Sequence, residues 1–128
     1  MLAYANATPR NVGQSSISGS RENTSDSIDM AAIYAALKYE ENAGRVPIEQ
    51  PHNNPGFDIE SSNADGNEQR LIEVKGLNAQ WNERGVKLTH VQFAMAQQHP
   101  EKFWIYVVEH ACNPKLQRNH PARTAVSV

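Results

Sequence analysis

The stretch "FWIYVVE", residues 103–109, is the strongest strand signal in the chain. It is nearly continuous in aromatic and β-branched residues, which are enriched in strands. An apolar run without polar alternation is typical of a strand that is covered on both faces. We therefore expect residues 103–109 to form a central strand of an α/β sheet, with the remaining elements arranged around it.

Two elements are predicted immediately before this strand. Thr89 and Gln92 fit the capping-box pattern, in which Ser or Thr is followed three residues later by Glu or Gln. The pattern predicts a helix that runs to about His99, and Pro100 helps to end it. The preceding "GVKLT", residues 85–89, predicts a short strand.

A hairpin is predicted further upstream. A short strand at residues 57–59 and the stretch "RLIEVKG", residues 70–76, are separated by the turn signal "NADGN". Side chains alternate between the two faces of a strand, so the apolar residues of both strands are expected to share one face. Asp58, Glu73 and Lys75 are then expected together on the other face.

A helix is predicted at the start of the domain. Asp26 and Ser27 offer an N-cap, and Gly44 is a candidate for the residue just past the helix end. Apolar residues recur at helical spacing, and Glu40 continues their face seven residues after Ile33. A carboxylate is therefore expected on the inward side of the last turn.

Together these elements give the order helix, three strands, helix, strand, which is typical of an α/β fold with a mixed central sheet flanked by helices. The chain has 128 residues, enough for one domain. Residues 1–26 are rich in Ser, Asn, Gly and Thr, and we expect them to form a flexible leader or linker. The domain is expected over residues 27–124, followed by a tail at residues 125–128.

The composition argues against a membrane protein and against a disulfide framework. The apolar runs are far shorter than the roughly 20 residues that span a bilayer, a signal-peptide pattern is absent, and Cys112 is the single cysteine. These features predict a cytoplasmic protein.

The charge is unevenly distributed along the chain. The net charge is −2, yet no acidic residue follows Glu109, whereas Lys115, Arg118 and Arg123 do. That end of the chain is either a solvated basic segment or a phosphate-contacting surface.

The predicted elements bring three carboxylates to one lysine: Glu40, Asp58 and Glu73 around Lys75. Burying unpaired carboxylates is costly unless something neutralises them. Mg²⁺ would do so, because it prefers oxygen ligands and commonly takes one or two protein carboxylates together with water and phosphate. A lysine at such a site can hold the attacking water or a phosphate oxygen. The simpler alternative is a surface ion pair between Glu73 and Lys75.

In its α/β frame this ordered set resembles the PD-(D/E)XK nuclease superfamily of restriction and repair endonucleases. More narrowly, residues 28–123 are similar to the DUF3883 domain, which is related to the carboxy-terminal domain of the plant protein NO VEIN. The segments that carry the similarity are "YEENAGR", "PGFDI", "IEVKG" with the following Trp81, "LTHVQ", "FWIYVV" and "NPKLQRNHP".

This resemblance implies a restriction-endonuclease-like core and a Mg²⁺ site in which Mn²⁺ can substitute. Asp58 and Glu73 would ligate the metal, with the backbone carbonyl of Val74 as a further ligand. Lys75 would position or activate the attacking water. Glu40 would be the helix-borne acid that reaches the metal through a water.

Two further residues are candidates for accessory roles. The capping box explains Gln92, which alternatively offers a polar group to the site. Trp81 either packs on the edge of the domain or stacks on a nucleic-acid base. The histidines lack zinc-ligand spacing, and a glycine-rich phosphate loop is absent, so the sequence favours neither a zinc site nor an NTPase.

The sequence therefore predicts a metal-dependent nuclease domain that hydrolyses phosphodiester bonds of DNA in a restriction, repair or defence system. The alternative is a catalytically silent, nuclease-like module that binds nucleic acid or a partner and is attached to a larger helicase or ATPase system. With one site per chain, cutting both strands of a duplex favours a homodimer.

Overall fold

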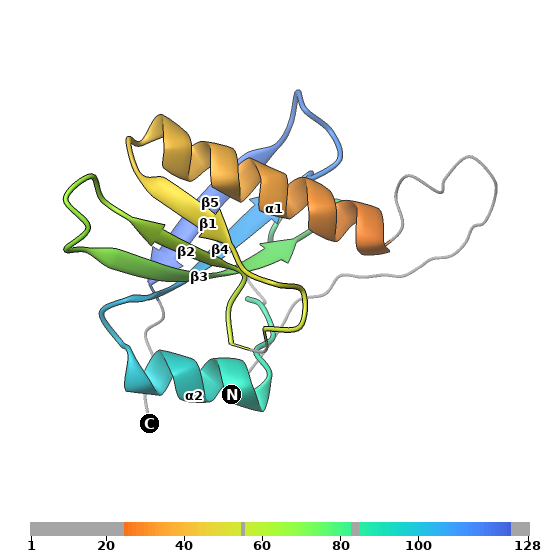
Figure 1. Cartoon of the computed structure of the whole chain (residues 1–128). Helices are drawn as coiled ribbons and strands as arrows, with labels where there is room; N and C mark the ends of the chain where they lie inside the picture. Colours follow the sequence, from red (N-terminus) through yellow and green to blue (C-terminus); the bar gives the residue numbers. More distant parts are fainter. Residues whose placement is uncertain (1–24, 55, 83–84, 124–128) are drawn as a thin grey trace.

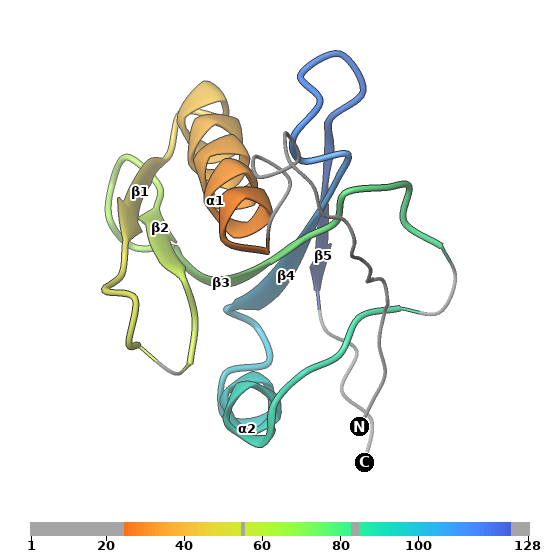
Figure 2. The same cartoon turned by 90° about the vertical axis from the view of Figure 1, so that its right-hand side faces the viewer.

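The structure is a computed structural model that describes residues 25–54, 56–82 and 85–123. Its elements, in chain order, are α1 (Ser25–Asn42), β1 (Val46–Glu49), β2 (Ile59–Ser62), β3 (Gln69–Gly76), α2 (His90–Gln98), β4 (Phe103–Glu109) and β5 (Arg118–Arg123). The strands form one mixed sheet in the order β1-β2-β3-β4-β5, in which β3 and β4 are parallel and the other neighbours antiparallel. Helix α1 lies on one face of the sheet and α2 on the other (Figure 1, Figure 2).

The central strand that the sequence predicts is confirmed as β4. It pairs with β3 on one side and with β5 on the other. Every residue of β4 except Trp104 is buried. Because β3 and β4 are parallel, the chain must cross over between them, and α2 lies in this connection.

The predicted hairpin is confirmed as the antiparallel pair β2–β3, but its first strand is Ile59–Ser62 rather than residues 57–59. The expectation that the apolar residues of the hairpin share one face is wrong, because Phe57 packs with Leu71 whereas Ile59 packs with Ile72 on the opposite face. Gly66 in the turn between the strands has a φ of +78°, a backbone conformation that glycine adopts without steric cost. Strand β2 begins at Ile59, which pairs with Ile72. Asp58 therefore lies just before the strand, and the part of β3 beyond Ile72 has no partner in β2.

Two details of the predicted strand order are wrong. Residues 85–89 are not a strand, and Val86 and Leu88 instead pack against the core. Conversely, β1 and β5 form where the sequence pattern predicts no strand. Both are edge strands that contain a proline, Pro47 or Pro121, and a proline in a run argues against any strand except one at the edge of a sheet.

Both predicted helices are confirmed, with small shifts at their ends. Helix α1 begins at Ser25, slightly before the predicted cap, and Gly44 just past its end has a φ of +81°. In α2 the predicted capping box is present. The backbone N–H of Gln92 donates to Thr89 Oγ1 at 3.1 Å, and the N–H of Thr89 donates to Gln92 Oε1 at 3.0 Å.

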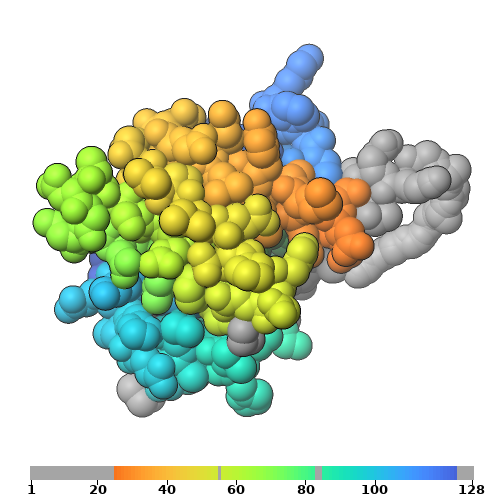
Figure 3. All heavy atoms as spheres, in the orientation of Figure 1, coloured from red at the N-terminus to blue at the C-terminus, as the bar shows by residue number. Residues whose placement is uncertain are grey.

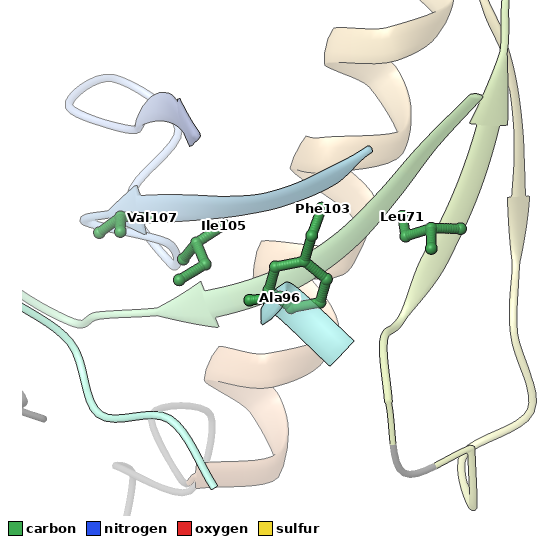
Figure 4. Packing of buried hydrophobic residues seen from close by; sticks show 5 residues of the cluster. All are labelled: Leu71, Ala96, Phe103, Ile105 and Val107. Atoms are coloured by element: carbon green, nitrogen blue, oxygen red, sulfur yellow. The ribbon is translucent and has the colours of Figure 1, made fainter. Parts of the chain in front are cut away.

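Each face of the sheet has its own apolar core, because consecutive residues of β3 and β4 point to opposite faces. The face toward α2 buries the cluster Leu71, Ala96, Phe103, Ile105 and Val107 (Figure 4). The face toward α1 buries Ala32, Ala35, Ala36, Ile59, Ile72, Tyr106, Val108 and Ala111. On the surface seen in Figure 3, α1 (orange) and the segment after it (yellow) lie above α2 (cyan).

Most of the predicted leader, residues 1–24, and the predicted tail, residues 125–128, lie outside the described residues. Ser25 and Asp26, which the sequence assigns to the leader, belong to the first turn of α1. In the described part of the chain, no helix combines the length and apolarity needed to cross a bilayer.

Candidate functional site

Asp58 occupies the place that β2 leaves free beside β3. Its backbone N–H donates to the carbonyl of Ile72 at 2.8 Å, which fixes the chain at the point where the two strands separate. Its side-chain Oδ2 then accepts a hydrogen bond from the backbone N–H of Val74 at 2.8 Å. The Asp58 carboxyl group is therefore held beside the second half of β3 by the backbone of the hairpin itself.

Glu73 and Lys75 extend the site along β3, on the face toward α2. The Nζ atom of Lys75 lies 3.3 Å from Oε2 of Glu73. The same Nζ donates to Oε1 of Gln92 at 3.2 Å. Because the capping box fixes this amide oxygen, the first turn of α2 positions Lys75. Gln92 thus contacts Lys75 in addition to capping the helix, and an accessory role in the site stays a prediction.

Burial changes the protonation of the two carboxyl groups. Glu73 is only 7% exposed, and burial raises its pKa to about 7, against the opposing effect of Lys75. Burial also raises the pKa of Asp58, although the Val74 N–H and Lys75 oppose the rise, and a hydrogen-bonding contact joins Asp58 to Glu73. Glu73 and Lys75 are therefore not the solvated surface pair of the simpler alternative. A nearby cation would stabilise both carboxylates in their charged form.

Asp29, in the second turn of α1, also lies near this site, and the sequence pattern does not predict it. Gly76 allows the helix to approach β3 closely, since a Cβ atom there would lie 3.1 Å from the carbonyl oxygen of Ile28. Burial raises the pKa of Asp29; the charge of Asp58 adds to the rise and that of Lys75 opposes it. The sequence signal for this neighbour is the glycine after Lys75, because glycine at a strand end permits close approach of another backbone.

Glu40 lies apart from the other predicted site residues, on the α1 face of the sheet. It is fully buried, as its inward position predicts. Its Oε1 accepts a hydrogen bond from Ser61 Oγ at 2.8 Å and lies 3.0 Å from Nε of Arg45. Its Oε2 lies 3.0 Å from a guanidinium nitrogen of Arg70 and accepts a hydrogen bond from the Tyr106 hydroxyl. The expectation that Glu40 shares a site with Lys75 is therefore not met by the geometry.

There is a physical reason why the sequence pattern wrongly assigns Glu40 to the site of Lys75. Helical spacing identifies the inward side of a helix but not the strand that each turn reaches. The first two turns of α1 pack at Gly76, near the end of β3, whereas the last turn reaches Ser61 of β2. Asp29 and Glu40 therefore lie toward opposite ends of the helix, and Asp29 is the acid of the two that lies near Lys75.

Trp81 packs in the loop between β3 and α2. Its backbone N–H donates to Oε1 of Glu109 at 2.8 Å, and its ring centroid lies 5.5 Å from that of His120. The indole also packs against the core cluster on the α2 face. This position agrees with the packing role considered for Trp81, while a stacking role toward a base stays a prediction.

The donor set fits a cation that needs few protein ligands. In the described residues, no group of three or more His, Cys, Asp and Glu side chains is arranged to hold a metal ion. Asp58 and Glu73 nevertheless offer two adjacent carboxyl groups, and Mg²⁺ commonly takes one or two, with water and substrate in its other positions. The backbone carbonyl of Val74 stays a predicted further ligand.

Comparison with known proteins bears on most of this chain. A family model described as "Protein NO VEIN, C-terminal" matches residues 28–121, which include Asp29, Asp58, Glu73 and Lys75. No curated protein matches, and neither does any solved structure. The chain belongs to the family of the NO VEIN carboxy-terminal domain.

Proposed function

We propose that this domain is a metal-dependent nuclease that hydrolyses phosphodiester bonds of DNA, built on a restriction-endonuclease-like core. The observation that supports it is the position of the Asp58 carboxyl group, which accepts the Val74 N–H at 2.8 Å beside Glu73, with the Lys75 ammonium group 3.3 Å from Glu73. Two carboxyl groups of raised pKa and one cation form a site that favours a divalent metal and a phosphate.

Each residue has a distinct role in this proposal. Asp58 and Glu73 hold Mg²⁺, or Mn²⁺ in its place, with the Val74 carbonyl as a further ligand. When bound, the metal polarises a phosphate oxygen and lowers the pKa of a bound water. Lys75 orients the attacking water or a phosphate oxygen, and Gln92 holds Lys75 in place through the 3.2 Å hydrogen bond.

Asp29 takes the position that the sequence pattern assigns to Glu40. It is the acidic residue of α1 whose charge acts on both Asp58 and Lys75. We assign it the role of a helix-borne acid that acts through a water rather than by direct ligation. Glu40 is left with a structural role, because two guanidinium groups and two hydroxyl groups already surround it.

The test is a cleavage assay on supercoiled, linear, single-stranded and methylated DNA with Mg²⁺ or Mn²⁺. Asp58→Asn and Lys75→Ala should abolish cleavage while the folded protein keeps its circular dichroism spectrum. Lys102→Ala is the matched control, because Lys102 is an exposed lysine in the turn just before β4. Undiminished cleavage by Lys75→Ala would refute the assignment.

A second function is favoured by one observation. The charge of Lys75 is already engaged by Glu73 and Gln92, so it is not freely available to a substrate. Such a site could belong to a catalytically silent module that binds nucleic acid or a protein partner, within a larger helicase or ATPase system. Thermal shift separates the two functions: stabilisation by Mg²⁺ or Mn²⁺ that Asp58→Asn removes supports the nuclease. DNA binding in chelator, without stabilisation by metal, supports the silent module.

The substrate geometry also bears on assembly. A single site per chain cuts one strand at a time, so cleavage of both strands of a duplex would require a homodimer or two successive events. Sedimentation of the protein with and without duplex DNA distinguishes these arrangements.

A further inference from the structure

Two arginines lie over one tryptophan on the α1 face of the sheet. The Cζ atom of Arg70 is 4.5 Å from the ring centroid of Trp104, and that of Arg123 is 5.2 Å from it. The strand register produces this arrangement, because Ile72, Trp104 and Arg123 are paired across β3, β4 and β5, and Arg70 precedes Ile72 by two residues on the same face. We call Arg70, Trp104 and Arg123 the arginine stack.

The arginine stack is accessible from solvent. Arg123 is exposed, the Arg70 side chain is 26% exposed, and Trp104 is half-buried. Trp104 is also the one residue of β4 that is not buried. The stack therefore forms part of the surface of the α1 face, in contrast to the buried Tyr106, the next residue of β4 on that face.

The charges in the stack are unequally neutralised. Arg70 is paired with Glu40 at 3.0 Å. For Arg123, no carboxylate among the described residues lies within 4.0 Å. The sequence beyond Glu109 adds cations and no acids. Arg123 is therefore an oriented cation that the described part of the domain does not neutralise, and an external anion can pair with it.

The chemistry of the stack selects the kind of anion. A guanidinium above an indole ring interacts with the ring through its cationic face, and the N–H groups at its planar edge match the two oxygens of a phosphate. The ring of Trp104 already has guanidinium groups over it, so it is not offered to a base. Contacts of this kind bind a nucleic-acid backbone without reading its sequence.

We infer that the arginine stack is a second nucleic-acid contact of this domain, which binds the phosphodiester backbone through Arg123 with Trp104 as its support. It lies on the face of the sheet opposite Glu73 and Lys75, so the strand it holds is a flanking part of the substrate rather than the part that is cut. The inference rests on the proposed function only in choosing nucleic acid over an acidic peptide as the partner.

The test is fluorescence anisotropy with labelled single-stranded and duplex oligonucleotides in EDTA, where cleavage cannot occur. Arg123→Gln should weaken binding about threefold to tenfold and reduce the slope of log affinity against log salt by about 1. Arg118→Gln is the matched control, because Arg118 is an exposed arginine of the same strand whose register partner in β4 is Glu109, so it lies on the α2 face. We expect the control to change neither quantity.

A second variant tests the support that the indole provides. Trp104→Leu keeps both arginines but removes the ring, so it should weaken binding less than Arg123→Gln and leave the salt slope near that of the unmodified protein. Circular dichroism establishes that the variant is folded before binding is measured. If Trp104→Leu does not fold, Arg123→Gln with its control still decides the inference.

Three results would overturn the inference: equal affinities of Arg123→Gln and Arg118→Gln, no binding of either oligonucleotide by the unmodified protein, or equally strong Arg123-dependent binding of a polyglutamate peptide. A preference for the single-stranded or the duplex probe, lost in Arg123→Gln, supports it and identifies the form of backbone that is held. Binding in EDTA that depends on Arg123, with no cleavage in Mg²⁺, leaves this inference standing and refutes the nuclease alone.

Discussion

The two faces of the sheet surround a buried glutamate in different ways. On the α1 face, Glu40 is fully buried, and it has two arginines and two hydroxyl groups as partners. On the α2 face, Glu73 is 7% exposed and has one lysine, while a second carboxyl group lies against it. The pKa of Glu73 is raised to about 7 by its burial.

Under the proposed function, this difference separates a structural acid, Glu40, from a metal-binding one, Glu73. A buried carboxylate whose oxygens all have partners has nothing left to offer a ligand, and it stabilises the fold only through the groups it already binds. A buried carboxylate that shares one cation with a neighbouring acid is under-neutralised, and a metal ion can supply the missing charge. Burial of a carboxyl group alone therefore does not identify a candidate metal site. The number of positive charges and hydrogen-bond donors around the buried carboxyl group is the better criterion.

The largest effect is expected from Glu40→Gln. This change removes the negative charge between Arg45 and Arg70 and leaves two guanidinium groups without their carboxylate. Breaking a buried ion pair by removing one partner is strongly destabilising, and we expect a loss of about 3 kcal/mol in the free energy of unfolding. Urea denaturation followed by circular dichroism measures the change.

Glu73→Gln is the matched change on the other face, and it should not destabilise the metal-free protein at pH 8. Should Glu40→Gln and Glu73→Gln lower stability equally, the distinction between the two faces would be lost. A stable Glu40→Gln variant without cleavage activity would instead return Glu40 to the site.

An effect of similar size is expected in the pH dependence of stability that Glu73 causes in the metal-free protein. Its pKa is raised in the folded state from 4.5 to about 7, so the folded state binds the proton more tightly. The contribution is fully present below pH 4.5 and is lost as the pH rises through 7, which costs about 3 kcal/mol at alkaline pH. Denaturation curves of the unmodified protein and Glu73→Gln should therefore agree at pH 4 and diverge at pH 8, with the unmodified protein the less stable.

Metal provides the internal control for this pH effect. Saturating Mg²⁺ favours the charged carboxylates, so it should recover much of the stability that the unmodified protein loses at pH 8. Glu73→Gln should gain less from the same addition. Parallel pH profiles of the two proteins in chelator would show that Glu73 keeps an ordinary pKa.

The sequence predicts the central elements of this fold better than its edges. The run from Phe103 to Glu109 forms the predicted central strand. The hairpin that carries Glu73 also forms, although its first strand begins at Ile59, two residues later than predicted. The edge strands β1 and β5 are missed because they contain Pro47 and Pro121. A proline fits a strand only at the edge of a sheet, where its missing N–H needs no partner. Whether a strand lies at the edge depends on the whole fold, so the local sequence does not show it.

The candidate site is predicted to a similar degree. Alternation alone places Glu73 and Lys75 together, and pairing across the hairpin adds Asp58. The acidic residue of α1 that neighbours Asp58 and Lys75 is not predicted correctly. Its identity depends on where α1 crosses the sheet, and no local pattern shows this. The sequence pattern therefore selects Glu40, whereas in the structure Asp29 lies near Asp58 and Lys75.

A smaller effect is expected from Gly76→Ala, which tests that crossing. The added Cβ would meet the Ala32 side chain at 2.7 Å and must push the first two turns of α1 away from β3. We expect a loss of about 1–3 kcal/mol in the free energy of unfolding. The cleavage rate of the folded protein should also fall, because Asp29 moves away from the site with the helix. Thermal denaturation and the cleavage assay measure the two quantities.

Gly56→Ala is the control for this change. Its Cβ would also meet a neighbour closely, at 2.6 Å, but that neighbour is the terminal methyl group of Met95, which can rotate aside. Cleavage by Gly76→Ala at the unmodified rate would show that Asp29 and the helix approach do not matter to the site.

The smallest effect on stability is expected at the start of α2, and it separates capping from function. Thr89→Ala and Gln92→Ala each remove half of the capping box, and each should cost about 1 kcal/mol in urea denaturation. Gln92→Ala alone also releases Lys75 from its 3.2 Å hydrogen bond, so it should lower cleavage well beyond the effect of Thr89→Ala. Equal cleavage by the two variants would make Gln92 a helix cap only. A selective loss would show that the helix start positions the lysine, because the cost to the fold is the same in both.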